Sequence, residues 1–460
     1  MAYTRRKSHE ITVGNIRWGG GNPIRVQSMT NTSTMDTEAS VAQILRIAEA
    51  GGELVRLTTQ GTREAENMEL ISQAVRQAGS SVPLVADVHF NPNVADVAAR
   101  YCEKVRINPG NYVDAARQFK QLEYTDEQYA QELQKIEARL LPFLQICREH
   151  GTAVRIGVNH GSLSDRIMSR YGDTPEGIVE SCMEFLRICV RHDFLNVVIS
   201  IKASNTVVMV QSMRLLVQEM DREGMTFPLH LGVTEAGEGE DGRIKSAVGI
   251  GALLTEGIGD TIRVSLSEAP EKEIPVARQL VDMIPECHRL RQEAEAGIKD
   301  DTVTLRLQAS SLEELQLKAA MAVGAIFIDK KAHLLNIEAE GFAEDILRDL
   351  SDSILQAARI KFVKTEYISC PGCGRTLYDL EGTIHKIKAA TAHLKGLKIA
   401  IMGCIVNGPG EMADADYGYV GAARGKVSLY KAKECIEKNI PEEEAVERLL
   451  KFIEEDLKQQ

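Results

Sequence analysis

The segment LVRLTT at residues 54–59 is followed by a helical pattern and then by PLVADVH at residues 83–89. Short β-rich runs that alternate with amphipathic stretches predict βαβ units and a parallel sheet. Similar runs lie on either side of these two segments. They are IRVQSM at 24–29, KVRIN at 104–108, AVRIGVN at 153–159, VVISIK at 197–202, LHLGVT at 229–234 and TIRVSLS at 261–267.

Eight such runs, separated by stretches with helical spacing such as 37–50 and 206–223, predict a (β/α)8 TIM barrel within residues 1–296. A doubly wound open sheet is the alternative. It is disfavoured because the first predicted strand is not followed by the glycine-rich turn of dinucleotide-binding sheets. The glycine-rich run at 237–259 is a weak phosphate-loop candidate, and we interpret it as a loop followed by a helix.

The rest of the chain predicts a short α/β insertion at 297–360 and a C-terminal α+β domain at 361–460, so the fold class is α/β with three segments. In the insertion we expect strands at 303–307 and 325–328 and helices at 311–323 and 343–359. In the last segment we expect helices at 379–394 and 442–457 and strands at 397–402, 418–420 and 426–430.

The charge and the apolar content of the chain argue against some classes of function. The chain has 460 residues and a formal net charge of −12, which argues against a general role in binding nucleic acid or a membrane surface. The sequence contains no apolar run long enough to span a bilayer and no apolar secretory segment. A cytoplasmic location is therefore the default expectation.

Three of the nine cysteines have unusual neighbours. Cys370 and Cys373 form a C-x-x-C turn, and Cys404 follows a predicted strand beside a glycine. This pattern favours an iron–sulfur site, because glycines let the backbone approach inorganic sulfide. A zinc site or a redox dithiol shares the C-x-x-C. A zinc site would need further ligands such as His385 or His393, and a dithiol leaves Cys404 unexplained.

The other cysteines are expected to be structural. Five lie in apolar contexts and are expected to be buried: Cys102, Cys147, Cys182, Cys189 and Cys287. Cys435 has helical spacing. Glu411, in the NGPGE turn after Cys404, is a candidate fourth ligand that would give one iron an exchangeable carboxylate, and a surface glutamate is the equal alternative.

Cations occur within five different predicted strands. They are Arg56, Arg106, Arg155, Lys202 and Arg263. Because the carboxyl ends of barrel strands converge on one mouth, these side chains predict a pocket for a phosphorylated anion. Polar residues share the same strand ends: Asp87, His89, Asn108, Asn159, His160, Ser204, Asn205, Glu235 and Ser265.

These residues resemble the 4-hydroxy-3-methylbut-2-enyl diphosphate synthase family of the methylerythritol phosphate route to isoprenoids. The most specific motifs are SCPGCGRT at 369–376 and GCIVNGPGEMADADYGYVG at 403–421. Supporting segments are RVQSMTNTST from Arg25, ADVHFN from Ala86, VRINPGN from Val105, VRIGVNHGSL from Val154, SIKASN from Ser200 and LGVTEAG from Leu231.

The resemblance implies a 4Fe-4S cluster held by Cys370, Cys373, Cys404 and Glu411. It implies binding of 2-C-methyl-D-erythritol 2,4-cyclodiphosphate, followed by reductive ring opening and loss of water. Electrons would come from ferredoxin or flavodoxin. The implied diphosphate-binding residues are Arg56, Arg106, Arg155, Asn159, Lys202, Arg263 and Ser265. Glu235 matches the family's candidate acid–base residue, Asp87 and His89 are weaker catalytic candidates, and Glu411 would yield its iron to substrate.

The chain departs from the family pattern in the 297–360 segment, which is too long for the two-domain form and too short for the full extra domain of other members. In two-domain members the cluster domain caps the barrel of a partner subunit in a head-to-tail dimer, and a long insertion could instead let the two domains meet within one chain. Of these alternatives we expect a homodimer. Two other classes of function fit parts of this pattern. A zinc-containing TIM-barrel transferase for a phosphorylated or pterin-like substrate would be colourless, and an iron–sulfur carrier would not need the cationic mouth.

Overall fold

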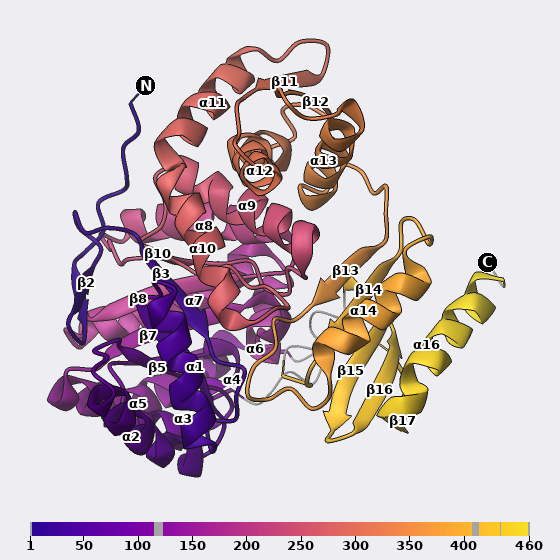
Figure 1. Ribbon diagram of the computed structural model, residues 1–460. Coiled ribbons are helices and arrows are strands. Elements are labelled where there is room, and N and C mark those ends of the chain that lie inside the picture. The colour runs from indigo at the N-terminus through magenta and orange to yellow at the C-terminus, as the bar shows by residue number, and fades with distance from the viewer. Residues whose placement is uncertain (1, 115–122, 407–413, 433, 459–460) are drawn as a thin grey trace.

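The computed structural model describes residues 2–114, 123–406, 414–432 and 434–458, and it confirms the predicted barrel (Figure 1). Its central sheet has the strand order β8-β7-β6-β5-β4-β3-β10-β9, with parallel neighbours throughout. A parallel bridge between Ile199 and Leu229 brings the two edges together, so the barrel is almost closed. The strands are β3 (Arg25–Met29), β4 (Leu54–Thr59), β5 (Leu84–Val88), β6 (Lys104–Ile107), β7 (Ala153–Asn159), β8 (Val197–Lys202), β9 (His230–Leu231) and β10 (Thr261–Ile262).

Helices surround this sheet, and side-chain caps set where several of them begin. Asp36, Thr174 and Asn205 each accept a backbone N–H in the first turn of the following helix. The helices are α1 (Thr37–Glu49), α2 (Thr62–Gln77), α3 (Pro92–Ala98), α4 (Pro109–Tyr112), α5 (Asp126–His150), α6 (Asp165–Tyr171), α7 (Pro175–Arg191), α8 (Thr206–Arg222), α9 (Gly239–Thr255), α10 (Glu273–Asp282) and α11 (Ile284–Ala296), with short 3-10 turns at His160–Ser162 and Pro270–Lys272.

An N-terminal hairpin, which the sequence did not predict, closes the amino end of the barrel. Its antiparallel strands are β1 (Ile11–Val13) and β2 (Ile16–Trp18). The buried Trp18 clusters with Leu54, Val85 and Ala153 from the barrel strands. Nζ of Lys104 lies 3.9 Å from the centroid of the Trp18 ring. Because this end is sealed by packing, the opposite end is the one open to a ligand.

The insertion packs on the outside of the barrel as an additional layer. Parallel strands β11 (Thr302–Arg306) and β12 (Leu334–Glu338) flank α12 (Leu312–Ile328), and α13 (Glu344–Ala357) follows. A Cβ at Gly324 would lie 2.8 Å from the Val248 carbonyl oxygen on α9, so glycine allows α12 and α9 to approach closely. The strand predicted at 325–328 is wrong. These residues are the buried end of α12, whose apolar residues surround the helix on all sides.

The C-terminal domain is a mixed sheet of order β13-β14-β15-β16-β17 with two helices packed on it. Its first three strands are parallel, and the rest are antiparallel. Cys435 lies on β17, so the predicted helical setting of this residue is wrong. The elements are β13 (Glu366–Ser369), α14 (Leu380–Thr391), β14 (Lys398–Met402), β15 (Tyr417–Ala423), β16 (Lys426–Lys431), β17 (Glu434–Pro441) and α16 (Glu442–Leu457).

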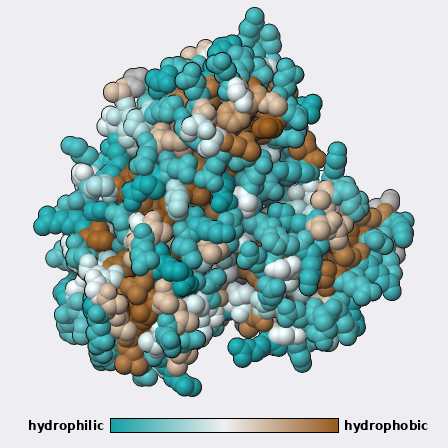
Figure 2. Space-filling view, viewed as in Figure 1, coloured by the Kyte–Doolittle hydropathy of each residue, from teal (hydrophilic) through white to brown (hydrophobic). Residues whose placement is uncertain are grey.

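The visible surface is mainly hydrophilic, with apolar residues scattered between polar ones (Figure 2). Among the described residues, no helix has the length and apolarity to cross a membrane. The five cysteines predicted to be structural, Cys102, Cys147, Cys182, Cys189 and Cys287, are all buried in the barrel and its helices, which confirms that interpretation.

Candidate active site

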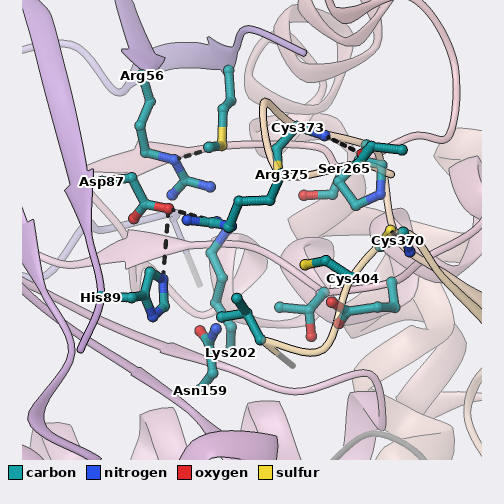
Figure 3. Close-up of a pocket in the computed structure, with 18 of the residues that line it drawn as sticks. Arg56, Asp87, His89, Asn159, Lys202, Ser265, Cys370, Cys373, Arg375 and Cys404 are labelled. Atoms are coloured by element: carbon teal, nitrogen blue, oxygen red, sulfur yellow. Dashed lines mark hydrogen bonds and ion pairs between the residues drawn. The ribbon is translucent and has the colours of Figure 1, made fainter. Parts of the chain in front are cut away.

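The carboxyl ends of the barrel strands and the cysteine loops of the C-terminal domain line one pocket (Figure 3). The barrel contributes every predicted cation and most of the predicted polar residues. The candidates that line the pocket are Arg56, Asp87, His89, Arg106, Arg155, Asn159, Lys202, Glu235, Arg263, Ser265, Cys370, Cys373 and Cys404. Residues more than 300 positions apart in sequence therefore share one cavity.

Glycines on neighbouring strands make room for the long cations. A Cβ at Gly157 on β7 would lie 2.6 Å from Nε of Arg106. A Cβ at Gly232, beyond β9, would lie 2.7 Å from Nζ of Lys202. Because any larger residue would displace these side chains, the glycines in AVRIGVN and LHLGVT are part of how the sequence builds the cationic mouth.

Asp87 is the centre of a buried ion network. Its Oδ1 accepts a hydrogen bond from Nη1 of Arg106 at 3.0 Å and lies 4.0 Å from Nη2 of Arg155. Although burial acts to raise the pKa of Asp87, the charges of Arg56 and Arg106 hold that pKa well below its usual range. Asp87 is therefore an ionised anchor for the arginines rather than a ready proton donor.

The remaining cations carry more positive charge than the neighbouring carboxylates balance. Glu273 on α10 pairs with Arg263 at 2.9 Å. Nε and Nη1 of Arg155, in contrast, have no hydrogen-bond partner among the described residues. Burial, together with the charges of Arg56 and Arg155, lowers the pKa of Lys202 well below its ordinary value. A polyanionic ligand in this pocket would relieve that repulsion.

His89 should stay neutral throughout the physiological range. Burial first, and then the charge of Arg106, lower its pKa to about 3, whereas an unfolded histidine titrates at about 6.5. Below about pH 6.5 His89 is therefore protonated in the unfolded chain but stays neutral in the folded protein. Its contribution lowers the free energy of unfolding as the pH drops towards 3. We expect the imidazole ¹⁵N signals of His89, assigned with His89→Asn, to stay unchanged from pH 8 to pH 5. A titration midpoint near 6.5 would contradict this.

The cysteine loops have features suited to an iron–sulfur cluster. The Gly403 N–H donates to Sγ of Cys370 at 3.2 Å, as backbone amides do towards cluster sulfurs. Burial raises the pKa of the Cys370 thiol to about 12, so a bound metal would be needed to hold it as a thiolate. Among the described residues, no three His, Cys, Asp or Glu side chains converge on a single-ion site. Cluster thiolates bind different irons and need not converge in that way.

Several contacts seat the cysteine domain on the barrel of the same chain. Ala236, just after Glu235, forms a parallel bridge with Ser369. The Ser267 hydroxyl donates to the Cys370 carbonyl oxygen at 2.9 Å. Glu235 has a φ of 49°, in the left-handed region that non-glycine residues seldom adopt. Backbone strain of this kind is common at functional sites. The strained residue Glu235 lies directly beside the bridge that joins Ala236 to Ser369.

Some candidates lie elsewhere. Asn108 and Asn205 cap helices, and His160 pairs with Asp173. His385 on α14 contacts Glu238 outside the pocket, and His393 follows that helix. Glu411 lies outside the described residues.

Arg375 is a pocket residue that the sequence reasoning missed. It stands within SCPGCGRT, only two positions after Cys373, and its placement in that motif was the available signal.

The fold and the site define a TIM-barrel enzyme whose cationic mouth is covered by a cysteine-bearing domain of the same chain. Two family comparisons agree with that description. Residues 8–278 match the GcpE TIM-barrel domain, and residues 366–455 match the GcpE protein C-terminal domain. The chain belongs to the GcpE family.

Its relatives include three bacterial proteins named 4-hydroxy-3-methylbut-2-en-1-yl diphosphate synthase (flavodoxin). The protein from Bacteroides thetaiotaomicron is 52% identical over 99% of each chain. That from Phocaeicola vulgatus is 51% identical over 98% of each. That from Parabacteroides distasonis is 48% identical over 99% of this chain and 98% of its own. The first alignment runs over 605 positions, so that relative contains a long stretch with no counterpart in this chain of 460 residues.

Proposed function

We propose that this chain converts 2-C-methyl-D-erythritol 2,4-cyclodiphosphate into 4-hydroxy-3-methylbut-2-enyl diphosphate in the cytoplasm, with flavodoxin as electron donor. The names of its relatives support the reaction and the donor. The observation that carries the proposal is the single pocket in which five barrel cations face three cysteines. Neither half alone would suit the reductive opening of a cyclic diphosphate.

The cations would hold and orient the substrate. Arginine matches phosphate oxygens with paired N–H groups, and Lys202 adds a point charge at the end of β8. We assign the diphosphate to Arg56, Arg106, Arg155, Lys202 and Arg263, with Asn159 and Ser265 beside them. The cap over the mouth would exclude water, which strengthens each of these interactions.

Cys370, Cys373 and Cys404 would hold a 4Fe-4S cluster, with Glu411 as the proposed fourth ligand. Such a cluster supplies single electrons, and the overall change consumes two electrons and two protons. A ring C–O bond to the diphosphate breaks, and one hydroxyl leaves as water. Glu235 lies on the cap side of the pocket and is the proposed proton donor to that leaving hydroxyl. Asp87 and His89 would chiefly orient Arg106.

Anaerobic purification followed by iron, sulfide and zinc assays tests the proposal. We expect about four irons and four sulfides per chain, a broad brown absorbance, and turnover of the cyclic diphosphate with dithionite and a viologen mediator. Cys404→Ser should lose iron and turnover, whereas Cys435→Ser, on the edge strand β17, should keep both. A colourless protein with one zinc and no sulfide would favour the zinc-containing transferase.

Within one chain the three cysteines already line the same pocket as the barrel residues. This arrangement differs from a head-to-tail dimer, in which each cap would cover the barrel of the partner subunit, and it matches the alternative in which the two domains meet within one chain. Whether the chain also forms a homodimer stays a prediction. Sedimentation of the cluster-loaded protein measures it directly, with a dimer mass expected.

A further inference from the structure

Arg375 extends from the cysteine loop of the C-terminal domain into the mouth of the barrel (Figure 3). Its Nη2 donates to Oδ2 of Asp87 at 3.1 Å, across 288 positions of sequence. The Asp87 side chain is buried, and that of Arg375 is 11% exposed. This is a charged contact between the cap and the floor of the pocket, so the position of Arg375 depends on the cap being closed.

The backbone next to Arg375 is held tightly against the barrel. A Cβ at Gly374 would lie 2.8 Å from the Thr32 carbonyl oxygen. On the other side, the Thr376 hydroxyl accepts the Cys373 N–H at 3.0 Å and so fixes the turn. The guanidinium of Arg375 is therefore aimed into the pocket by the packing of the two domains, and Gly374 is the residue that permits this approach.

Two nitrogen atoms of Arg375 are buried without partners. Nε and Nη1 have no hydrogen-bond partner among the described residues. Asp87 satisfies only Nη2, and it also receives Arg106 at 3.0 Å on its other oxygen. Buried unpaired donors on a charged group are costly. Their presence in a cationic pocket indicates that an anionic ligand supplies the missing acceptors.

We propose that Arg375 is a substrate-binding residue of the cap: Nη2 holds Asp87 and latches the cap shut, while Nε and Nη1 bind the diphosphate together with the barrel cations. This inference rests on the proposed function. A bound diphosphate would then favour the closed state, because that state offers the diphosphate donors that an open state does not. Cap and barrel then enclose the anion between them.

The test is calorimetric titration of the cluster-loaded enzyme without reductant, so that the substrate binds and does not turn over. The probes are the cyclic diphosphate and inorganic diphosphate. A hydrogen bond to a charged group is worth about 1.5–3 kcal/mol, and 1.4 kcal/mol is tenfold in affinity. We therefore expect Arg375→Gln to weaken binding of the cyclic diphosphate by about 10- to 100-fold. Arg424→Gln, in the exposed turn between β15 and β16 of the same domain, should bind like the unaltered enzyme.

Inorganic diphosphate tests the contact with the diphosphate group itself. We expect Arg375→Gln to weaken binding of inorganic diphosphate by a similar factor. Unchanged affinity of Arg375→Gln for both probes would overturn the proposed contact.

Arg375→Lys is the second variant, for use if Arg375→Gln does not fold or does not keep its brown cluster. This variant keeps the charge but not the planar fork, and it should weaken binding by a smaller factor. If Arg375→Lys bound as tightly as the unaltered enzyme, the inference would fail. If the unaltered enzyme itself failed to bind the cyclic diphosphate, the proposed function would fail instead.

Discussion

Glu235→Gln is expected to reduce turnover of the cyclic diphosphate by roughly 10²- to 10⁴-fold, the usual contribution of a positioned general acid or base. Glu235 lines the pocket together with Cys404 and Lys202. Its left-handed φ of 49° and the adjacent bridge from Ala236 to Ser369 hold it at the boundary between barrel and cap. Glutamine keeps the size of the side chain and removes the transferable proton.

The measurement is kcat with dithionite and a viologen, alongside the iron content and the affinity for substrate without reductant. We expect the iron content to stay unchanged and the affinity to change by less than about threefold, since the diphosphate is held by the cations. Glu240→Gln, at an exposed position in the first turn of α9, is the matched control. Activity within threefold of the control would remove Glu235 from the proton-transfer role.

Glu273→Ala should lower the free energy of unfolding by about 3–5 kcal/mol, because it leaves a buried cation unpaired. The Glu273 carboxylate accepts hydrogen bonds from Nε and Nη2 of Arg263 at 3.0 and 2.9 Å. It also accepts the Ser28 hydroxyl at 2.6 Å and the Leu266 N–H at 3.1 Å. Without this carboxylate, Arg263 would face the other pocket cations alone.

Urea unfolding under anaerobic conditions measures the difference, with Glu271→Ala as control. Glu271 lies two positions earlier and pairs with the half-exposed Arg46 at 3.2 Å. An exposed pair of this kind contributes at most about 1 kcal/mol. Equal losses in the two variants would show that Arg263 does not depend on Glu273. Saturating substrate should restore part of the loss in Glu273→Ala, because the diphosphate is a second counter-charge for Arg263.

Much of the barrel could be predicted because its signals are local. Each strand is a short β-rich run, and the three runs at β4, β7 and β8 were predicted with the observed bounds. The prediction of secondary structure failed where the local sequence favours one element and burial in the folded protein stabilises another, or where the element is too short to be recognised. The end of α12, AIFI at 325–328, has strand-like residues, but it completes a helix that is buried on every side. The short strands β1 and β2 carry too few residues to give a periodic signal.

The sequence by itself determined which residues could do the chemistry. Strand-end cations and glycine-flanked cysteines are unusual enough in type and spacing to be recognised without coordinates. Tertiary structure alone decided which of them meet. The pairing of Arg375 with Asp87 and the bridge from Ala236 to Ser369 join segments that are distant in sequence. Both contacts form because the C-terminal domain packs on the barrel. The partner of a buried charge is decided by which groups lie close to it in three dimensions, and the sequence does not state those distances.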